Sequence, residues 1–269
     1  MDVGLAPLTL GRPAPDVLVT AAAAAGFSRV GLTLWAPGEP LSPVCTRPDG
    51  RRTLRTHLDA AGVAVTDVGV VVLSPALDLQ QVAALIGTGR ALGADQVLVL
   101  DLDDDRRRAL GRFRAVCDLA GQAGLQVVVE FMPYSATRTL AEAAALVAAA
   151  DVPFAGVVVD VLHLYRSGGS AADVAAVAPG TVRLVQLCDA TREAPPAERL
   201  REEALTDRRY PGEGELPLPE LLAVVPPGAR LTVEAPVARH ADRSPAERAA
   251  AAAAALRRMA PLTPGRSPS

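Results

Sequence analysis

The chain alternates between short apolar runs and longer segments rich in alanine and leucine. The runs have the length and valine content of buried strands, and the segments between them follow the period of amphipathic helices. Strand and helix repeated in this way are typical of a closed (β/α)8 barrel or of a long doubly wound sheet. Eight strands are predicted, at residues 3–8, 29–34, 64–73, 96–102, 126–131, 156–161, 183–187 and 230–235.

Glycines at the predicted helix ends support the barrel. Four of them directly follow an apolar helical segment, where glycine adopts the left-handed conformation that ends a helix, namely Gly26, Gly62, Gly93 and Gly124. No glycine-rich phosphate loop follows the first strand, which disfavours a dinucleotide-binding sheet. We therefore predict an α/β fold with a single (β/α)8 TIM barrel over residues 1–260 and a disordered tail over 261–269. The predicted helices are 15–25, 54–61, 79–92, 105–123, 140–149 and 171–177, with a further helix at 199–205.

The composition excludes several classes of partner. The net charge is −3 and no basic stripe occurs, so nucleic acid is not an expected partner. No segment offers about 20 apolar residues, so no membrane span is expected. The three cysteines lack CxxC spacing and no secretory segment precedes them, which favours a reducing cytoplasm. The alanine-rich outer helices would allow a homo-oligomer.

Four apolar runs in the second half of the chain end on a residue that can bind a metal. The residues are Glu130, Asp160, Gln186 and Glu234. The carboxyl ends of barrel strands converge on one mouth, so four such ends would bring these side chains together. Three carboxylates repel one another unless a cation neutralises them, and oxygen ligands favour Mn2+, Mg2+ or Co2+. At any single position, the alternative is that the residue binds no metal and is simply a polar side chain beside solvent at the end of a strand.

A metal at this mouth would hold adjacent hydroxyl and carbonyl oxygens and stabilise the enediolate that forms when the carbon between them loses a proton. Glu130 and Glu234 each present two oxygens and are candidate bases. His163 is the third candidate, because it follows Asp160 by three residues, near the metal and not buried in the barrel. The alternative for His163 is a surface residue that begins the next loop.

Five further residues are candidates for substrate binding. Trp35 and Tyr134 would stack on a ring or plug the barrel top, and Asp189 would orient a ligand or cap its loop. Arg208 and Tyr210 belong to a long polar segment after the seventh strand, which we expect to overhang the mouth. Arg208 would pair with a phosphate or carboxylate, or lie exposed in the loop. The acidic run DLDDD at 101–105 is predicted to cap the following helix.

Five short motifs follow one another from Glu130 onward: EFMPYS at 130–135, DVLHLYRSGG at 160–169, VQLCDA at 185–190, RRYPGEGELPL at 208–218 and VEAP at 233–236. In their order and spacing they resemble the xylose isomerase-like TIM-barrel superfamily of sugar phosphate isomerases and epimerases. The superfamily also contains inosose-processing enzymes, ketose 3-epimerases and 3-dehydroshikimate dehydratases. The resemblance covers essentially the whole barrel and is strongest from Glu130 onward.

The resemblance implies a ligand set. Glu130, Asp160 and Glu234 match three metal ligands of the superfamily, whereas the fourth, a histidine in many members, is Gln186 here. Glutamine at this place is similar to the bacterial 3-dehydroshikimate dehydratases, in which a histidine matching His163 assists the chemistry. The third strand, DVGVVVLSP, lacks the arginine that those dehydratases use for the substrate carboxylate.

We therefore predict a divalent-metal-dependent isomerase or epimerase that acts through an enediolate on a sugar-like or cyclitol-like carbonyl substrate. The alternative is a metal-dependent lyase of the 3-dehydroshikimate dehydratase type, in which the same enediolate expels a hydroxyl group and His163 is the acid. A third hypothesis is a barrel that binds a small molecule without turnover. A DNA phosphodiesterase of the same superfamily is disfavoured, because it needs several histidine ligands and a basic groove.

Overall fold

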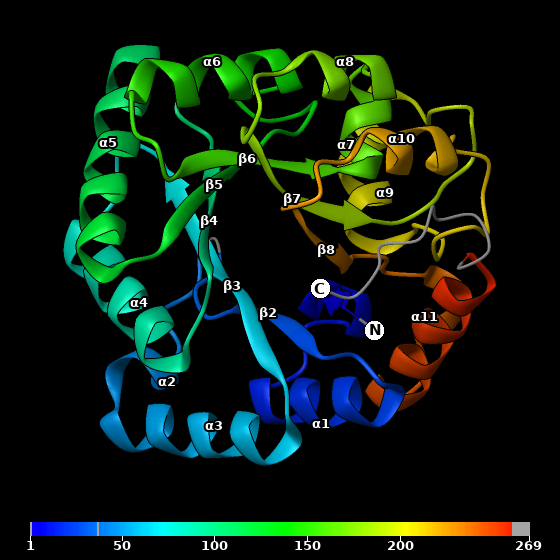
Figure 1. Cartoon of the computed structure of the whole chain (residues 1–269), viewed down its shortest axis with the longest axis horizontal. Coiled ribbons are helices and arrows are strands. Elements are labelled where there is room, and N and C mark those ends of the chain that lie inside the picture. Colours follow the sequence, from blue (N-terminus) through cyan, green and yellow to red (C-terminus); the bar gives the residue numbers. More distant parts are fainter. Residues whose placement is uncertain (1, 37, 260–269) are drawn as a thin grey trace.

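Eight parallel strands close into one barrel in the computed structural model, which describes residues 2–36 and 38–259. Each strand pairs with its neighbours in chain order, and β1 closes the ring by pairing with β8. Figure 1 shows the strands inside a ring of helices. The predicted (β/α)8 barrel is thereby confirmed. The strands are β1 Gly4–Leu5, β2 Arg29–Thr33, β3 Ala64–Leu73, β4 Gln96–Asp101, β5 Gln126–Glu130, β6 Ala155–Asp160, β7 Val182–Leu187 and β8 Arg230–Val233.

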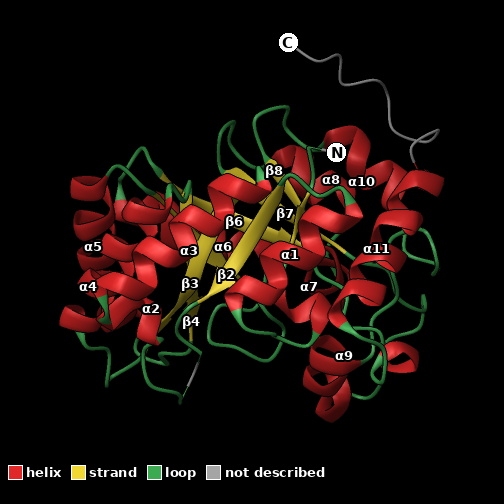
Figure 2. Cartoon of the chain, turned by 90° about the horizontal axis from the view of Figure 1, so that it is seen from below, coloured by secondary structure: helices red, strands yellow, loops and turns green. Residues whose placement is uncertain are grey.

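Helices cover the outer face of the strands (Figure 2). The main apolar core lies between strands and helices, where valine, leucine and alanine fill nearly all the buried positions. A second, smaller core fills the barrel interior. The helices are α1 Pro15–Ala25, α2 Pro43–Thr46, α3 Pro48–Ala61, α4 Leu79–Leu92, α5 Arg106–Ala123, α6 Leu140–Ala150, α7 Val161–Arg166, α8 Ala171–Ala176, α9 Leu200–Thr206, α10 Leu218–Val224 and α11 Pro245–Met259, with 3-10 turns η1 Pro7–Leu10, η2 Ala197–Arg199 and η3 Ala238–His240.

The predicted helix ends are confirmed. The four glycines that follow α1, α3, α4 and α5 all have positive φ, between 65° and 86°, and their N–H groups return to carbonyls of the last turn. The acidic run at 101–105 does cap α5, because the carboxylate of Asp105 accepts hydrogen bonds from the N–H groups of Arg107 and Arg108.

The largest differences from the predicted boundaries lie in the first strand and at the start of α3, whereas the other strands and helices differ by one or two residues at most. The first strand spans two residues instead of 3–8, because Pro7 begins the turn η1 directly after β1. Helix α3 begins at Pro48, six residues before the predicted start, since proline suits the first helical position. Helices α2, α7, α10 and α11 were not predicted. The predicted tail at 261–269 lies outside the described residues.

The long polar segment after β7 folds back over one end of the barrel, as predicted. It contains η2, α9 and α10, and Figure 2 shows α9 at the barrel end. A bridge between Asp189 and Arg209 joins the two sides of the segment. Within the described residues, no helix combines the length and the apolar character needed to cross a bilayer.

The barrel interior offers a test of the packing. Leu184 on β7 is fully buried and packs with Leu98, Val128 and Val158, so a shorter side chain there would leave a cavity. We expect Leu184→Ala to lower the free energy of unfolding by about 2–5 kcal/mol, measured by urea denaturation. Leu79→Ala is the matched control, since Leu79 is 42% exposed, and should change stability by less than about 1 kcal/mol. Equal losses would contradict an interior filled by side chains.

Candidate active site at the carboxyl end of the barrel

A cavity of about 490 Å³ opens at the carboxyl ends of the strands. Its walls come from both halves of the barrel and from the segment after β7. The residues that line one side are charged or polar, and those on the other side are mostly leucine, valine and methionine. Glu130, Gln186 and Glu234 line this cavity, and the fully buried Asp160 lies behind it.

Strand pairing explains why the four predicted residues meet. Glu130 and Asp160 are the last residues of β5 and β6. Asp160 pairs in register with Gln186 on β7. Glu234 directly follows β8, and its N–H donates to the carbonyl of Leu187 at 2.9 Å. The structure therefore brings all four positions to one end of the barrel.

His163 lies inside this end of the barrel, and its side chain is only 2% exposed. The expectation that it is not buried was therefore wrong. The reason is local: Asp160 caps α7 by accepting a hydrogen bond from the N–H of His163 at 3.0 Å, so the helix begins at once and no loop intervenes. The Nε2 of His163 lies 3.6 Å from Oε1 of Glu130. Tyr134 packs edge-on against the imidazole, with ring centroids 5.6 Å apart.

Arg208 reaches the same carboxylates and is almost fully buried. Its Nη1 donates to Oδ2 of Asp160 at 2.5 Å and to the carbonyl of Glu234 at 3.0 Å, and its Nε donates to the carbonyl of Ala204 at 2.8 Å. Its Nη2 lies 3.6 Å from Oε2 of Glu234. The prediction had Arg208 pairing with a substrate anion or lying exposed in the loop. The structure shows that its main partners are the protein's own acidic and carbonyl groups.

Burial and mutual repulsion shift the titration of the site. Burial, and then the charges of Glu234 and Asp160, raise the pKa of Glu130 well above its usual range. Burial also raises the pKa of Glu234 to about 7 and lowers the pKa of His163 to about 4. Burial is the largest influence on Asp160 and would raise its pKa, but the charges of Arg208 and His163 together with the hydrogen bonds from Arg208 and from the His163 N–H outweigh it, and the pKa falls. His163 is therefore neutral near pH 7.

Two buried polar atoms in this cluster have no hydrogen-bond partner among the described residues: Oε1 of Gln186 and Nδ1 of His163. A buried amide oxygen without a partner is costly, and a cation is a natural partner for it. Three carboxylates and one guanidinium leave two negative charges, which one divalent cation would neutralise. One ligand atom each from Glu130, Asp160 and His163 lies within 4.8 Å of the others. The donor set thus suits a divalent cation.

The five residues predicted to bind substrate separate into two groups. Tyr134 and Arg208 line the cavity, whereas Trp35, Asp189 and Tyr210 do not. The indole of Trp35 donates to the carbonyl of Glu39. The phenol of Tyr210 donates to the carbonyl of Arg248 and packs against a histidine ring.

Asp189 is engaged by the segment after β7. Its carboxylate accepts hydrogen bonds from the N–H groups of Ala190, Gly212 and Leu216, at 2.8–3.1 Å. Of the two roles predicted for Asp189, the structure therefore agrees with the one in which it caps its own loop. The carboxylate holds the turn that follows Arg208 and Arg209.

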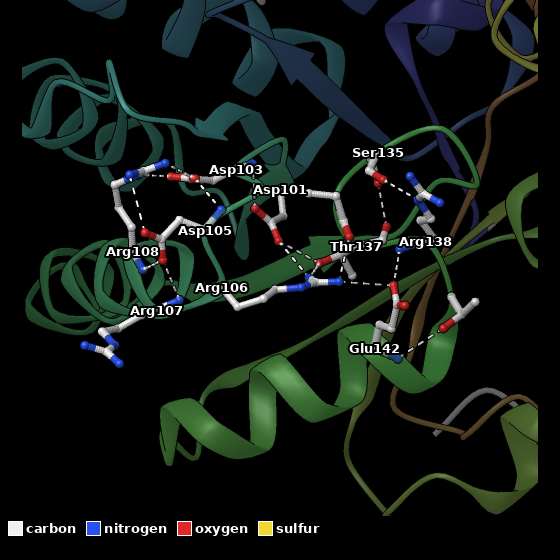
Figure 3. A network of polar contacts seen from close by, with 12 residues as sticks. Asp101, Asp103, Asp105, Arg106, Arg107, Arg108, Ser135, Thr137, Arg138 and Glu142 are labelled. Atoms are coloured by element: carbon white, nitrogen blue, oxygen red, sulfur yellow. Dashed lines mark hydrogen bonds and ion pairs between the residues drawn. The ribbon is translucent and has the colours of Figure 1, made fainter.

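A polar network holds the loop that carries Tyr134 (Figure 3). The hydroxyl of Thr137 donates to the carboxylate of Asp101 at 2.7 Å, and both side chains are fully buried. Arg106 donates to that hydroxyl at 3.1 Å and to the carbonyl of Ala136 at 2.7 Å. The end of β4 thereby fixes the loop after β5, which places Tyr134 beside His163.

Three charged residues in the cavity wall were missed from the sequence. Asp67 lies within β3 and faces the cavity, and the bare Cα of Gly31 on β2 makes room for it: a Cβ there would lie 2.9 Å from the Asp67 carboxylate. Burial, and then the charge of Asp95, raise the pKa of Asp67 to about 7. The sequence did contain a signal for Asp67, because it is an acidic residue within an otherwise apolar strand. Arg12 and Arg201 also line the cavity, and no local pattern marks them.

The chain belongs to the xylose isomerase-like TIM barrel family, whose model matches residues 19–260. A comparison with curated proteins gives no significant match. The family and the barrel agree with the resemblance found in the second half of the sequence.

Several solved structures share the fold over nearly their whole length. The IolI protein with a zinc atom gives a TM-score of 0.79 at 15% identity, covering 95% of this chain and 96% of that one. The probable 3-DHS dehydratase AsbF from Bacillus anthracis gives 0.75 at 15%, with coverages of 96% and 99%. The D-psicose 3-epimerase from Clostridium cellulolyticum H10, with D-tagatose, gives 0.74 at 16%, with coverages of 98% and 100%.

The chain spans only 45% of another similar structure, a fusion of a xylose isomerase-like TIM barrel with 4-hydroxyphenylpyruvate dioxygenase. That match has a TM-score of 0.75 and 21% identity over 99% of this chain. At these identities the likenesses show the fold.

The raised pKa of Glu234 predicts how pH acts on the metal-free protein. The folded state binds this proton more tightly than the unfolded chain, so ionising Glu234 as the pH rises costs folding free energy. After chelator treatment, we expect Glu234→Gln to be more stable than the wild type at about pH 8, by on the order of 3 kcal/mol, with a smaller gap at about pH 5. Urea titrations measure both values.

The control for this prediction is Glu198→Gln, because Glu198 is an exposed glutamate on η2. It should leave stability within about 0.5 kcal/mol of the wild type at both pH values. A Glu234→Gln protein that is less stable than the wild type at the higher pH would show that its pairing with Arg208 outweighs its burial.

Proposed function

We propose that the protein is a divalent-metal-dependent isomerase or epimerase that acts through an enediolate on a polyhydroxylated carbonyl substrate. The observation that carries the proposal is the convergence of Glu130, Asp160, Gln186 and Glu234 at one end of the barrel, where Asp160 lies behind the cavity that the other three line. Once the three carboxylates are ionised, Arg208 balances only one of them. A stable barrel has no need of this concentration of buried acids, and such concentrations are typical of functional sites.

The same four residues would hold the cation, which we propose to be Mn2+, Mg2+ or Co2+ because all four donors are hard oxygens. The free Oε1 of Gln186 supports this assignment. When bound, the cation would supply the positive charge that stabilises an enediolate on the substrate. His163 lies close enough to Glu130 and Asp160 to add a nitrogen donor or to act on the substrate directly.

The protein's own groups would move the proton. Glu130 on β5 and Glu234 after β8 are separated by two strands around the barrel, so they approach a bound substrate from different sides. One carboxylate takes the proton from the carbon next to the carbonyl, and the other returns a proton to the opposite face or to the neighbouring carbon. The edge of Tyr134 and the apolar wall exclude water from this exchange.

A dehydratase is the second candidate, and His163 is the observation that favours it. The imidazole is buried, neutral and 3.6 Å from Glu130. A neutral imidazole first accepts a proton, so His163 would take it from carbon and then give it to a leaving β-hydroxyl. The C–H and C–O bonds break, a C=C bond forms and water leaves. The similarity to the probable 3-DHS dehydratase agrees with this reaction but shows only a shared fold.

The metal content of the purified protein tests the proposal. We expect about one Mn, Mg or Co per chain by elemental analysis, and a sharply lower content in Glu234→Gln, because one of four ligands loses its charge. Glu198→Gln is the control and should keep the wild-type content. Absence of metal, together with no thermal shift on adding Mn2+, would remove the enolisation chemistry and favour a binding barrel.

Reaction in D2O separates the two candidate reactions. The Mn2+-loaded protein is incubated with D-psicose, D-tagatose or 3-dehydroshikimate. An isomerase or epimerase incorporates solvent deuterium at the carbon next to the carbonyl, whereas a dehydratase converts 3-dehydroshikimate to an aromatic product with a new absorbance band. We expect Glu130→Gln to lower the rate of isomerisation or epimerisation by about a hundredfold or more, because it removes one of the two carboxylates that exchange the proton. Full activity in this variant would exclude Glu130 as the base.

A further inference from the structure

Two arginines lie in the wall of the active-site cavity, outside the carboxylate cluster. Arg12 follows the turn η1, and Arg201 belongs to α9 in the long segment after β7. Both residues are exposed. Within residues 2–36 and 38–259, neither side chain forms an ion pair or a hydrogen bond. Arg208, the remaining arginine of this wall, is instead held by Asp160. The guanidinium groups of Arg12 and Arg201 thus have no hydrogen-bond or ion-pair partner among the described residues, and the charge of Arg12 acts on Glu234 across the cavity wall.

The backbone at Arg12 is fixed in an uncommon conformation. Its φ is 56°, in the left-handed region that side chains other than glycine rarely adopt, and the preceding Gly11 has a φ of 80°. The N–H of Arg12 donates to the carbonyl of Pro7 at 2.9 Å, which closes the turn. Such conformations persist where the surrounding structure imposes them, and they gather at ligand sites. Here the turn places the guanidinium of Arg12 in the cavity wall.

Apart from Asp67, another part of the cavity wall is apolar. Its residues come mainly from β2, β3 and β4 and from the loop after β5, namely Leu32, Val70, Leu98, Leu100, Leu102 and Met132. A polyhydroxylated substrate would turn its less polar face toward this wall, because a hydroxyl group without a hydrogen-bond partner there costs free energy. The hydrocarbon face of a substrate fits it, and a polar substituent remote from the reacting carbons finds its strongest partners in Arg12 and Arg201.

The net charge of the cavity also favours an anionic group near Arg12 and Arg201. A divalent cation would neutralise the two negative charges that Glu130, Asp160, Glu234 and Arg208 leave. Arg12 and Arg201 then add two positive charges to the wall, and Asp67 offsets at most one of them. The loaded cavity would therefore attract an anionic group.

We propose that Arg12 and Arg201 form a subsite for an anionic substituent of the substrate, a carboxylate or a phosphate, while the body of the substrate packs against the apolar wall. The inference rests on the proposed function, because it names the substrate class of the same cavity. The third strand lacks the arginine expected of the dehydratases that the sequence resembles. In this chain the cations come from the turn after β1 and from α9 instead.

The test compares two matched pairs of compounds by isothermal titration calorimetry with the Mn2+-loaded protein. One pair is shikimate and methyl shikimate, and the other is D-ribulose 5-phosphate and D-ribulose. We expect the charged member of at least one pair to bind about tenfold tighter than its neutral partner, with a smaller preference at high salt. A preference in the first pair identifies a carboxylate, and one in the second identifies a phosphate.

The variants Arg12→Ala and Arg201→Ala, singly and together, complete the test. In the double variant the charge preference should fall to about threefold or less, while the Kd for Mn2+ stays unchanged. Arg107→Ala is the control, because Arg107 is an exposed arginine on α5 outside the cavity, and it should keep the full preference.

Equal binding of the charged and neutral compounds by the wild type would overturn the subsite, and so would a preference that survives in the double variant. Failure of the wild type to bind Mn2+ would instead overturn the proposed function. The same titrations on the metal-free protein would then still measure whether the two arginines prefer an anion, so the two failures are distinguishable.

Discussion

The ion pair between Asp160 and Arg208 determines how the end of the barrel is built. Both side chains are almost fully buried, and the two oxygens of Asp160 have separate tasks: Oδ1 caps α7 and Oδ2 binds the guanidinium. Arg208 in turn binds carbonyls on α9 and after β8. One carboxylate at the end of β6 thus places both His163 and the segment over the cavity. Removing one partner of a buried pair typically costs about 3–5 kcal/mol.

The carboxylates at the same end of the barrel repel one another, and this repulsion lowers the stability of the folded state. Glu130 and Glu234 lie close to Asp160, and Arg208 compensates only one of the three carboxylates. Stability therefore has to come from elsewhere, and the interior cluster of β4–β7 and the helix–strand core supply it through apolar burial. The network around Asp101 adds rigidity on the β4 side, where no surplus charge accumulates. A bound cation would neutralise the repulsion between the carboxylates, and because it binds the folded state it would also stabilise the fold.

Features that depend on a short stretch of sequence were predictable, and features that depend on packing were not. Val-rich runs ending in Glu130 or Asp160, and Gly26 after an alanine-rich helix, each carry their own local signal. The burial of His163 follows from a cap that begins α7 at once, and the burial of Arg208 follows from a partner 48 residues away. Neither of these two causes produces a periodic pattern in the sequence, so the burial of His163 and Arg208 could not be predicted from it. The assignment of the four strand ends as metal ligands remains a proposal.

The two halves of the barrel contribute differently to the cavity, and this bears on which reaction follows enolisation. β5 and the residue after β8 supply Glu130 and Glu234, whereas β2 to β4 supply mostly hydrocarbon together with Asp67. An enediolate can take up a proton or expel a neighbouring hydroxyl, and the outcome depends on which bond lies beside His163 and Glu130. An anion held by Arg12 and Arg201 would fix the rotation of the substrate against the apolar wall. By fixing the substrate in this way, the two arginines would decide whether His163 faces a C–H or a C–O bond.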